Sequence, residues 1–330
     1  MDLTRILFLS DTHLGFDHPR APRVRRRRRG SDFFANFERA LSPALKGEVD
    51  AVVHGGDVFF RSRVAPEVVL RALRPLKAVA DLGIPVYVVP GNHDRSRTPL
   101  PLLWQHPGIF VFDRPRTFVH HRRGRTFSIS GFPYEHSVRA AFPGLVEATG
   151  WKHAAADARF LVMHHAVEGA TVGPRDFTFG SQPDVVRTAD IPSGFAAILS
   201  GHIHRAQALT RDGSGRALPA PVLYPGSTER TSFAEKDERK GTLTLAVQPN
   251  GRLRGWRFRE LPSRPMRRIE LSASDLPKRR LTAILSQLPA DAVVQLKVAA
   301  PVPASLAITA VRAMAPTTMD VSVSPLHSFR

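Results

Sequence analysis

Aspartate, asparagine and histidine residues occur in five short clusters that are far apart in the chain. The clusters are SDTHLG, GGDVF, GNHD, MHH and GHIH, and their candidate functional residues are Asp11, His13, Asp57, Asn92, His93, Asp94, His164, His202 and His204. Carboxylate, amide oxygen and imidazole groups without sulfur suit divalent cations such as Mn²⁺, Fe²⁺ or Zn²⁺. One such residue alone is usually structural, whereas five clusters together indicate a metal site.

Each cluster directly follows an apolar run that is typical of a buried strand. The runs cover residues 5–9, 49–57, 84–94, 158–165 and 195–204, and amphipathic segments at 31–41 and 65–83 separate the first three. Alternating strands and helices at this spacing predict stacked βαβ units. Loops at the carboxyl ends of such strands converge, so the clusters are expected to share one crevice. In GHIH, the two imidazoles at i and i+2 lie on one side of an extended segment and could each reach one of two neighbouring metals.

Proline, glycine and serine positions predict where the elements begin and end. Ser31 is expected to cap the helix that starts after it, and Pro75 to kink or break the helix over 65–83. Asn250-Gly251 predicts a β-hairpin. The segment 261–268, with two prolines and several basic residues, is typical of a linker. We therefore expect a main domain over residues 1–262 and a small α/β capping domain over 266–330.

The order of the five clusters resembles the calcineurin-like metallophosphoesterase superfamily. The segments SDTHLG, GDVF, GNHDR and YPGSTER are further similar to its SbcD-type DNA-repair exonucleases, and the resemblance covers roughly residues 1–260. It implies an α/β fold with a two-layered β-sheet core flanked by helices, a four-layer αββα sandwich, to which the small C-terminal α/β cap is added. It also implies phosphodiester hydrolysis by water.

The resemblance assigns roles to the clustered residues. One metal would be held by Asp11, His13, Asp57 and His204, and the other by Asp57, Asn92, His164 and His202, with Asp57 as the bridge. Two divalent ions are implied, Mn²⁺ first, with Mg²⁺, Fe²⁺ and Zn²⁺ as alternatives. His93 would protonate the leaving oxygen, and Asp94 would fix the tautomer of His93.

Net charge points to a polyanionic partner. The 330 residues include 47 Lys and Arg against 29 Asp and Glu, a formal charge of +18, and nucleic acid is the usual partner of such a chain. Cysteine is absent, which excludes disulfides, thiolate metal sites and cysteine nucleophiles. The single apolar run near the N-terminus is too short for a signal sequence or a membrane span, so we expect a cytoplasmic protein.

Several basic residues are candidates for contacts with the DNA backbone. Five consecutive arginines, Arg25, Arg26, Arg27, Arg28 and Arg29, lie between the first cluster and the following helix, which would place them at the mouth of the site. Runs of like charge are usually solvated, but phosphate contacts dominate nucleic-acid affinity. Arg95 is expected to clamp a phosphate. The family resemblance further implies that Ser227 and Arg230, in YPGSTER, support phosphate or neighbouring ligands.

The leading hypothesis is a two-metal DNA nuclease, acting from DNA ends in repair or recombination. Phe60 stands where members of the DNA-cutting group commonly have His or Asp, which weakens the transfer of a specific exonuclease activity. Two alternatives stay open: a phosphodiesterase or phosphatase for small nucleotides, and a catalytically silent DNA-binding subunit. Expected partners are DNA, an SbcC-type ABC ATPase and a second copy of the chain in a homodimer.

Overall fold

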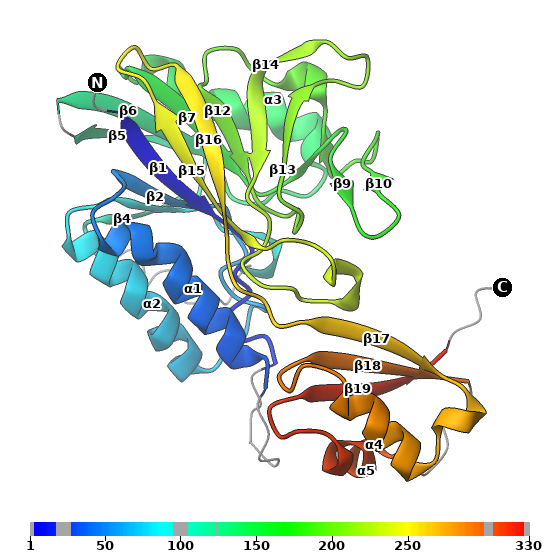
Figure 1. The fold of residues 1–330 in the computed structure, drawn as a ribbon. Helices are drawn as coiled ribbons and strands as arrows, with labels where there is room; N and C mark the ends of the chain where they lie inside the picture. The colour runs from blue at the N-terminus through cyan, green and yellow to red at the C-terminus, as the bar shows by residue number, and fades with distance from the viewer. Residues whose placement is uncertain (1–2, 18–27, 95–104, 123, 300–305, 327–330) are drawn as a thin grey trace.

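Two six-stranded mixed β-sheets, packed face to face, form the main body of the protein (Figure 1). The computed structural model describes residues 3–17, 28–94, 105–122, 124–299 and 306–326. Helices cover the outer face of each sheet, and a smaller three-stranded sheet with two helices follows at the C-terminal end. The expected four-layer αββα sandwich with a C-terminal α/β module is confirmed.

The first sheet places three of the polar clusters at one edge. Its strands, in spatial order, are β16 (Leu253–Glu260), β15 (Gly241–Val247), β1 (Thr4–Leu9), β2 (Ala51–His54), β3 (Val86–Val88) and β4 (Ile109–Val111). Strands β1 to β4 are parallel neighbours, whereas β15 pairs antiparallel with both β1 and β16. Strands β15 and β16 form the hairpin predicted at Asn250-Gly251.

The second sheet brings the other two clusters to the same edge. Its strands, in spatial order, are β13 (Gln207–Arg211), β14 (Ala217–Tyr224), β12 (Ala197–Ser200), β7 (Ala158–Met163), β6 (Arg125–Gly131) and β5 (Arg116–Arg122). The central neighbours β14, β12, β7 and β6 run parallel. Short two-residue strands follow β7, namely β8 (Ala166–Val167), β9 (Thr171–Val172), β10 (Phe177–Thr178) and β11 (Val185–Val186).

Three apolar clusters hold these layers together. Between the sheets, side chains such as Phe8, Tyr87 and Phe160 are buried. Helices α1 (Gly30–Leu45) and α2 (Pro66–Asp81) pack on the outer face of the first sheet, and α3 (Val138–Ala148) packs against the second. Burial on both faces explains why these strands read as continuous apolar runs. No helix within the described residues is long and apolar enough to cross a bilayer.

One expectation about the helices was wrong, and another was wrong in part. The helix α1 begins at Gly30, and its N-cap is Arg29, so the Ser31 hydroxyl instead donates to the carbonyl oxygen of Arg28 at 3.1 Å. Pro75 does not break α2, which continues to Asp81. Packing of the apolar face of α2 against the first sheet stabilises the helix despite the missing N–H of proline.

The C-terminal module consists of two consecutive βαβ units. Its elements are β17 (Met266–Leu271), α4 (Lys278–Ser286), β18 (Val293–Val298), α5 (Ile308–Met314) and β19 (Asp320–Pro325), and the three strands are parallel. Both helices pack over a separate apolar core that includes Leu281, Leu296 and Val311. The strands and helices expected after the linker are therefore present.

Candidate metal centre

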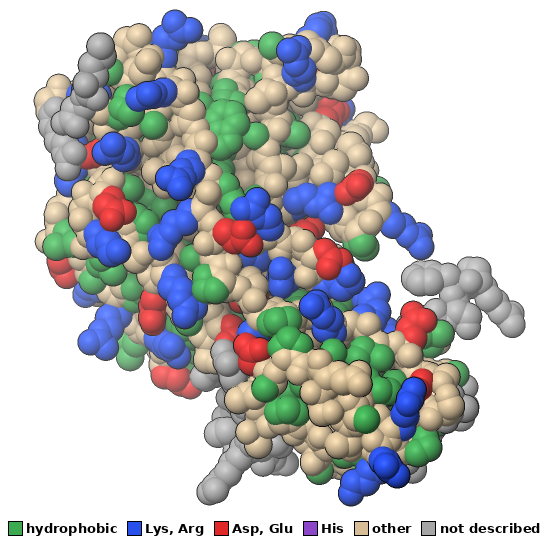
Figure 2. Space-filling view, in the orientation of Figure 1, with side chains coloured by type: hydrophobic (Ala, Val, Ile, Leu, Met, Phe, Trp, Pro, Cys, Tyr) green, Lys and Arg blue, Asp and Glu red, His purple; other side chains and the backbone are tan. Residues whose placement is uncertain are grey.

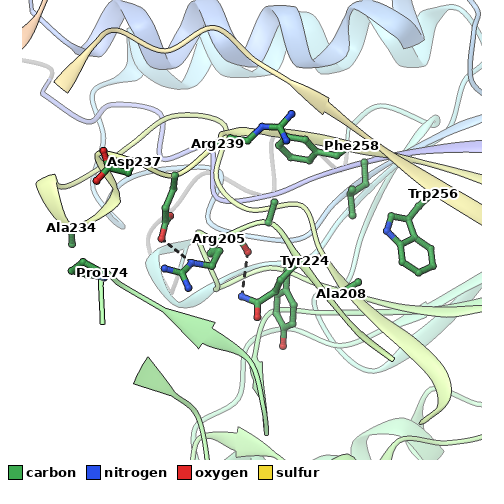
Figure 3. A pocket seen from close by; sticks show the side chains of 13 residues that line it. Pro174, Arg205, Ala208, Tyr224, Ala234, Asp237, Arg239, Trp256 and Phe258 are labelled. Atoms are coloured by element: carbon green, nitrogen blue, oxygen red, sulfur yellow. Dashed lines mark hydrogen bonds and ion pairs between the residues drawn. The ribbon is translucent and has the colours of Figure 1, made fainter. Parts of the chain in front are cut away.

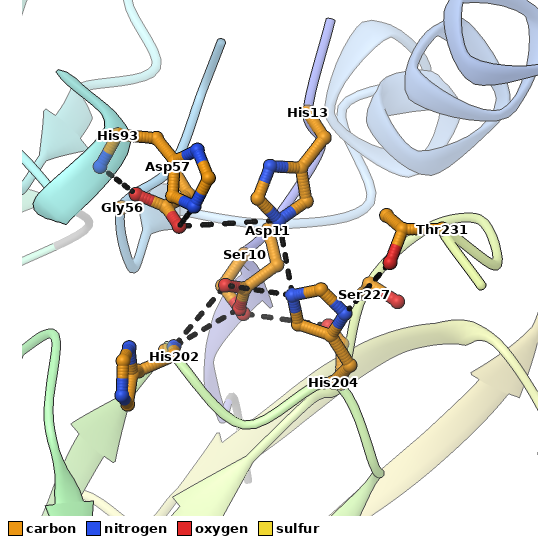
Figure 4. Close-up of polar contacts among 12 residues, drawn as sticks. Ser10, Asp11, His13, Gly56, Asp57, His93, His202, His204, Ser227 and Thr231 are labelled. Carbon is orange, nitrogen blue, oxygen red and sulfur yellow. Dashed lines mark hydrogen bonds and ion pairs between the residues drawn. The ribbon is translucent and has the colours of Figure 1, made fainter. Parts of the chain in front are cut away.

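The polar clusters meet where the carboxyl ends of the strands from both sheets approach one another. Asp11 and His13 follow β1, Asp57 follows β2, and Asn92 to Asp94 form the 3₁₀ turn η1 after β3. His164 follows β7, while His202 and His204 follow β12. A parallel bridge between Ser10 and Ser227 joins the ends of β1 and β14, so the two sheets touch at this point (Figure 4).

One group of donors contains Asp11, His13 and His204. The Nε2 atoms of His13 and His204 face each other at 3.0 Å, and Nε2 of His204 lies 3.8 Å from Oδ1 of Asp11 (Figure 4). One donor atom from each of the three residues lies within 4.8 Å of the others. Asp11 and His13 are buried. Two imidazole nitrogens and a carboxylate converging on one point are a suitable donor set for a divalent cation.

A second group surrounds His164. Its Nε2 lies 3.4 Å from Oδ2 of Asp57 and 3.1 Å from Oδ1 of Asn92, and the same Asn92 oxygen lies 3.1 Å from Nδ1 of His202. Oδ2 of Asp57 is also 3.9 Å from Nε2 of His13, which belongs to the first group. Asp57 therefore connects the two donor groups. All seven residues expected as ligands are brought together, and their donor types fit two divalent ions.

Backbone strain positions four of these residues. Asp11, His13, Asp57 and His202 have φ values of 51°, 43°, 52° and 80°. For residues other than glycine, this left-handed region costs about 1–2 kcal/mol each. Such strain persists at functional sites when surrounding structure enforces it, and hydrogen bonds between the loops do so here, such as Asp11 N–H to the Gly56 carbonyl oxygen at 2.9 Å.

Two glycines allow the loops to approach this closely. A Cβ added at Gly56 would lie 2.3 Å from Nδ1 of His164, and one added at Gly91 would lie 2.2 Å from Oδ1 of Asp57. Both distances are far below van der Waals contact, so any larger residue would push these two donors out of place.

Burial and neighbouring charges shift the pKa values of the imidazoles in opposite directions. Burial, followed by the charge of His204, lowers the pKa of His13 to about 3, and burial, followed by the charge of His164, lowers that of His202 to about 3. Burial alone would lower the pKa of His164, but Asp57 raises it to about 9. In return, His164 holds the pKa of Asp57 below its usual range, against the effect of burial. The carboxylates thus attract positive charge to the centre.

His93 lies at the solvent side of the centre. Its side chain is 38% exposed, and its Nε2 is 3.9 Å from Oδ2 of Asp57. The Nδ1 atom lies 2.6 Å from the carbonyl oxygen of Phe60, to which it donates, so Nε2 is the atom that faces the centre. The Phe60 ring stacks on the His93 ring with centroids 6.1 Å apart. Phe60 therefore restricts the rotation of His93.

The expected role of Asp94 in fixing the His93 tautomer was wrong. Its carboxylate accepts hydrogen bonds from the backbone N–H groups of Val58, Phe59 and Gly91, each at 3.1 Å. Asp94 is buried and holds the loops after β2 and β3 together. The carbonyl oxygen of Phe60 takes the position at Nδ1 that was expected for this carboxylate.

Of the arginine run, the described residues include only Arg28 and Arg29. Arg29 is buried, within 5.3 Å of the Phe16 ring centroid and 3.7 Å from Oε1 of Glu229, so it stabilises the fold and is not free to grip DNA. Arg28 pairs with Asp17. Arg25, Arg26, Arg27 and Arg95 lie outside the described residues.

The segment after β14 is bonded to backbone groups of its neighbours. The Ser227 hydroxyl donates to the carbonyl oxygen of Glu229 at 2.8 Å, and the Ser227 N–H donates to that of His204 at 3.1 Å. The guanidinium of Arg230 donates to the carbonyl oxygens of Glu238 and Arg264. The expectation was support for phosphate or for neighbouring ligands, and the bond from Ser227 to His204 fits the second of these. The phosphate contact stays a prediction.

A buried charged network behind His204 was missed from the sequence. Oε1 of Glu235 lies 3.2 Å from Nδ1 of His204, and Oε2 lies 2.7 Å from Nζ of the fully buried Lys240. Lys240 also donates to Oε2 of Glu238 at 3.0 Å. Although burial would raise the pKa of Glu235, His204 and Lys240 hold it well below its usual range. Glu235 therefore accepts Nδ1–H and directs the Nε2 lone pair of His204 to the centre.

We expect Glu235→Gln to weaken Mn²⁺ binding by about 10- to 100-fold, because a neutral amide holds the His204 tautomer less firmly. Isothermal titration calorimetry measures the affinity, and Glu270→Gln, an exposed position on β17, is the matched control. An unchanged affinity in Glu235→Gln would show that the contact has no influence on the ligand.

His54 and His165 are structural. Nε2 of His54 lies 3.0 Å from the hydroxyl of Thr12, and burial lowers the pKa of His54 to about 3. His165 stacks on Tyr134, with ring centroids 4.9 Å apart. Tyr134 also lies 6.0 Å from the His202 ring, a neighbour of the centre that no sequence motif indicated.

The sequence of this chain is similar to one known family and to several named proteins. The model of the family described as calcineurin-like phosphoesterase matches residues 4–206. The chain is 30% identical over 240 residues to the DNA double-strand break repair protein Mre11 of Haloferax volcanii, covering 72% of this chain and 48% of that protein. With the Mre11 protein of Aeropyrum pernix it shares 27% identity over 286 residues, covering 83% and 64%.

The chain thus spans between about half and two thirds of the length of these curated relatives. Among solved structures, the protein TT1561 of Thermus thermophilus has a TM-score of 0.47 at 12% identity, covering 78% of this chain and 99% of that one. A dimetal phosphatase from Danio rerio has a TM-score of 0.43 at 13% identity, covering 73% and 92%.

Proposed function

Because this chain belongs to the calcineurin-like phosphoesterase family, we propose that it hydrolyses phosphodiester bonds of DNA with two divalent metal ions, in repair or recombination. The observation that carries the proposal is the convergence of seven donors, bridged by Asp57, at the edge of the paired sheets. The similarity to Mre11 repair proteins over most of the chain supports DNA as the substrate, and so does the charge of +18.

Two ligand sets are proposed. Asp11, His13, Asp57 and His204 would hold one ion, and Asp57, Asn92, His164 and His202 the other. When bound, two such ions supply a hydroxide nucleophile at neutral pH and offset charge on the phosphate. Mn²⁺ is the proposed ion; comparison of turnover with Mn²⁺, Mg²⁺, Fe²⁺ and Zn²⁺ tests this choice.

His93 is proposed as the general acid. Its Nδ1–H stays bonded to the Phe60 carbonyl oxygen, so the proton delivered to the leaving oxygen comes from Nε2, on the solvent side of Asp57. A complete donor set beside a partly exposed imidazole favours an active enzyme over a silent DNA-binding subunit.

We expect His93→Ala to lower kcat by about 10²- to 10⁴-fold without loss of the metals, because general acid catalysis contributes an effect of this size. The substrates are labelled linear and circular DNA, in single- and double-stranded form, together with a small chromogenic phosphodiester. His153→Ala, at an exposed position, is the control. Undiminished DNA cutting by His93→Ala would refute the assignment, and hydrolysis of small phosphodiesters alone would favour the small-nucleotide alternative.

The proposed domain boundary lies between residues 262 and 266. Arg264 supports it, because its buried guanidinium joins the two parts: it lies 3.2 Å from Oδ2 of Asp32 in α1 and donates at 2.7 Å to the Thr318 carbonyl oxygen. We propose residues 266–330 as a cap on the catalytic domain. An SbcC-type ATPase and a second copy of the chain remain predicted partners, which co-purification and sedimentation equilibrium would test.

A further inference from the structure

Strand β16 presents arginine and aromatic side chains on the open edge of the first sheet. Its sequence, LRGWRFRE, places Arg254, Arg257 and Arg259 in exposed positions, and Trp256 is 39% exposed. β16 is the last strand of its sheet, so its outer side has no neighbouring strand among the described residues. Around it, Lys and Arg side chains are spread over the face of the main body shown in Figure 2.

One side of β16 borders an aromatic hollow of about 700 Å³ (Figure 3). Trp256 and Phe258, two residues apart, line this hollow from the same strand, opposite Tyr224 of the second sheet. The guanidinium of Arg239 lies 5.3 Å from the centroid of the Phe258 ring. The hollow therefore offers an accessible aromatic face beside the ion pair of Arg239 and Glu260.

The other side of β16 borders a basic hollow of about 850 Å³, between the end of α1 and the outer face of β15 and β16. Its four cationic side chains are Arg5, Lys46, Arg257 and Arg259, all exposed. Two acidic residues also line it. Of these, Glu260 pairs with Arg239 at 2.7 Å, which leaves Glu48 against the four cations.

Protection of the open sheet edge against pairing with other chains explains only part of this surface. Charged side chains on an edge strand discourage pairing with other chains, which accounts for the arginines. It does not account for Trp256, because an exposed aromatic side chain on an edge favours association. An acidic peptide would use the cations alone. Single-stranded nucleic acid uses both features, since its phosphates bind cations and its bases stack on aromatic rings.

We propose that β16, together with Arg5 and Lys46, binds single-stranded nucleic acid at a surface separate from the metal centre. β16 ends beside the support of that centre, because Glu260 pairs with Gly241, the residue after Lys240. Trp256 is four residues further back, about 14 Å along an antiparallel strand. A single strand of nucleic acid bound along β16 would thus be held next to the metal centre. The inference deepens the proposed DNA function but requires no metal.

Fluorescence of Trp256 provides the first test. In EDTA and low salt, an oligo(dT) of roughly 20 nucleotides is expected to quench the tryptophan emission, and Trp256→Phe is expected to remove most of this quenching. Trp256→Ala should weaken binding of the oligonucleotide by about 5- to 150-fold, because the stacking of one base on an aromatic ring contributes an effect of this size. Trp151→Phe, whose ring packs against Phe195, is the matched control. Full quenching in Trp256→Phe would overturn the proposal.

Salt dependence provides the second test. The triple variant Arg5→Gln, Lys46→Gln, Arg257→Gln should reduce the slope of log affinity against log salt by about two, since each phosphate contact on a single strand contributes about 0.7. The control triple Arg74→Gln, Lys77→Gln, Arg114→Gln removes exposed cations elsewhere. An equal change in both triples, or equally tight binding of poly-glutamate, would reject the nucleic-acid surface.

These outcomes are independent of the proposed catalytic function. Both tests are performed without metal, whereas hydrolysis of a small chromogenic phosphodiester with Mn²⁺ reports on the metal centre alone. We expect the Trp256 and triple variants to retain that hydrolysis. If the variants lose oligo(dT) binding but keep hydrolysis, the proposed binding surface is supported. If the unaltered protein binds oligo(dT) but shows no hydrolysis, the catalytic proposal is refuted and the binding surface is not affected.

Discussion

Asp57→Asn is expected to abolish the two-metal centre, with a decrease in turnover of at least about 10³-fold, equivalent to about 4 kcal/mol of transition-state stabilisation. Oδ2 of Asp57 lies 3.4 Å from Nε2 of His164 and 3.9 Å from Nε2 of both His13 and His93. The substitution keeps the shape of the side chain but removes the charge that both donor groups share. Metal analysis should therefore find at most one ion per chain.

The control is Asp81→Asn. This exposed carboxylate at the end of α2 lies 2.9 Å from Nε2 of His106, far from the donor groups in the chain. Circular dichroism would confirm that both variants are folded. Two tightly bound ions in Asp57→Asn, with turnover within tenfold of the unaltered protein, would show that the carboxylate is not the bridge.

The buried strands along the chain and the position of the centre could be predicted because both depend on local patterns. Asp11, Asp57 and His164 each follow an apolar run, and parallel strands between buried layers leave their carboxyl ends at one edge. The Asn250-Gly251 hairpin likewise follows from the turn itself. In these cases a few neighbouring residues determine the structure.

The support of the centre could not be predicted, because it depends on contacts between distant residues. Glu235 meets His204 across 31 positions, and nothing in the segment that contains it distinguishes a buried carboxylate from a solvated one. Arg29 was read as part of a basic run, but Phe16 and Glu229 bury it. Asp94 was assigned to its neighbour His93, although its carboxylate is bonded to backbone N–H groups in the loop after β2 and in its own loop after β3.

The metal-free protein is expected to lose stability as pH falls below about 6.5. Burial lowers the pKa of His13, His54 and His202 to about 3, and it lowers the pKa of His165. The folded protein therefore keeps four imidazoles neutral at a pH where the unfolded chain protonates them, near 6.5. Because the unfolded state binds more protons, its free energy falls relative to that of the folded state as acid is added.

Three carboxyl groups oppose this effect. Burial raises the pKa of Asp94 to about 7, and it raises the pKa values of Asp11 and Glu229, so in mild acid the folded protein holds protons on these groups that the unfolded chain lacks. Each imidazole that is neutral only in the folded state steepens the loss of stability by about 1.4 kcal/mol per pH unit, and each such carboxyl group reduces the slope. His164 affects stability at higher pH. Its contribution to the stability of the folded protein is complete below pH 6.5 and is lost as pH rises through about 9.

Urea denaturation with a chelator, followed from about pH 7.5 down to 4.5, would measure this slope. Added Mn²⁺ should raise the urea midpoint at pH 7.5 by mass action, and the increase should fade in acid because the donors must be deprotonated to bind a cation. The acid sensitivity and the metal site then have one origin, since burial keeps imidazoles neutral for metal binding and opposes their protonation. A midpoint that stays constant between pH 7 and 5 would contradict this link.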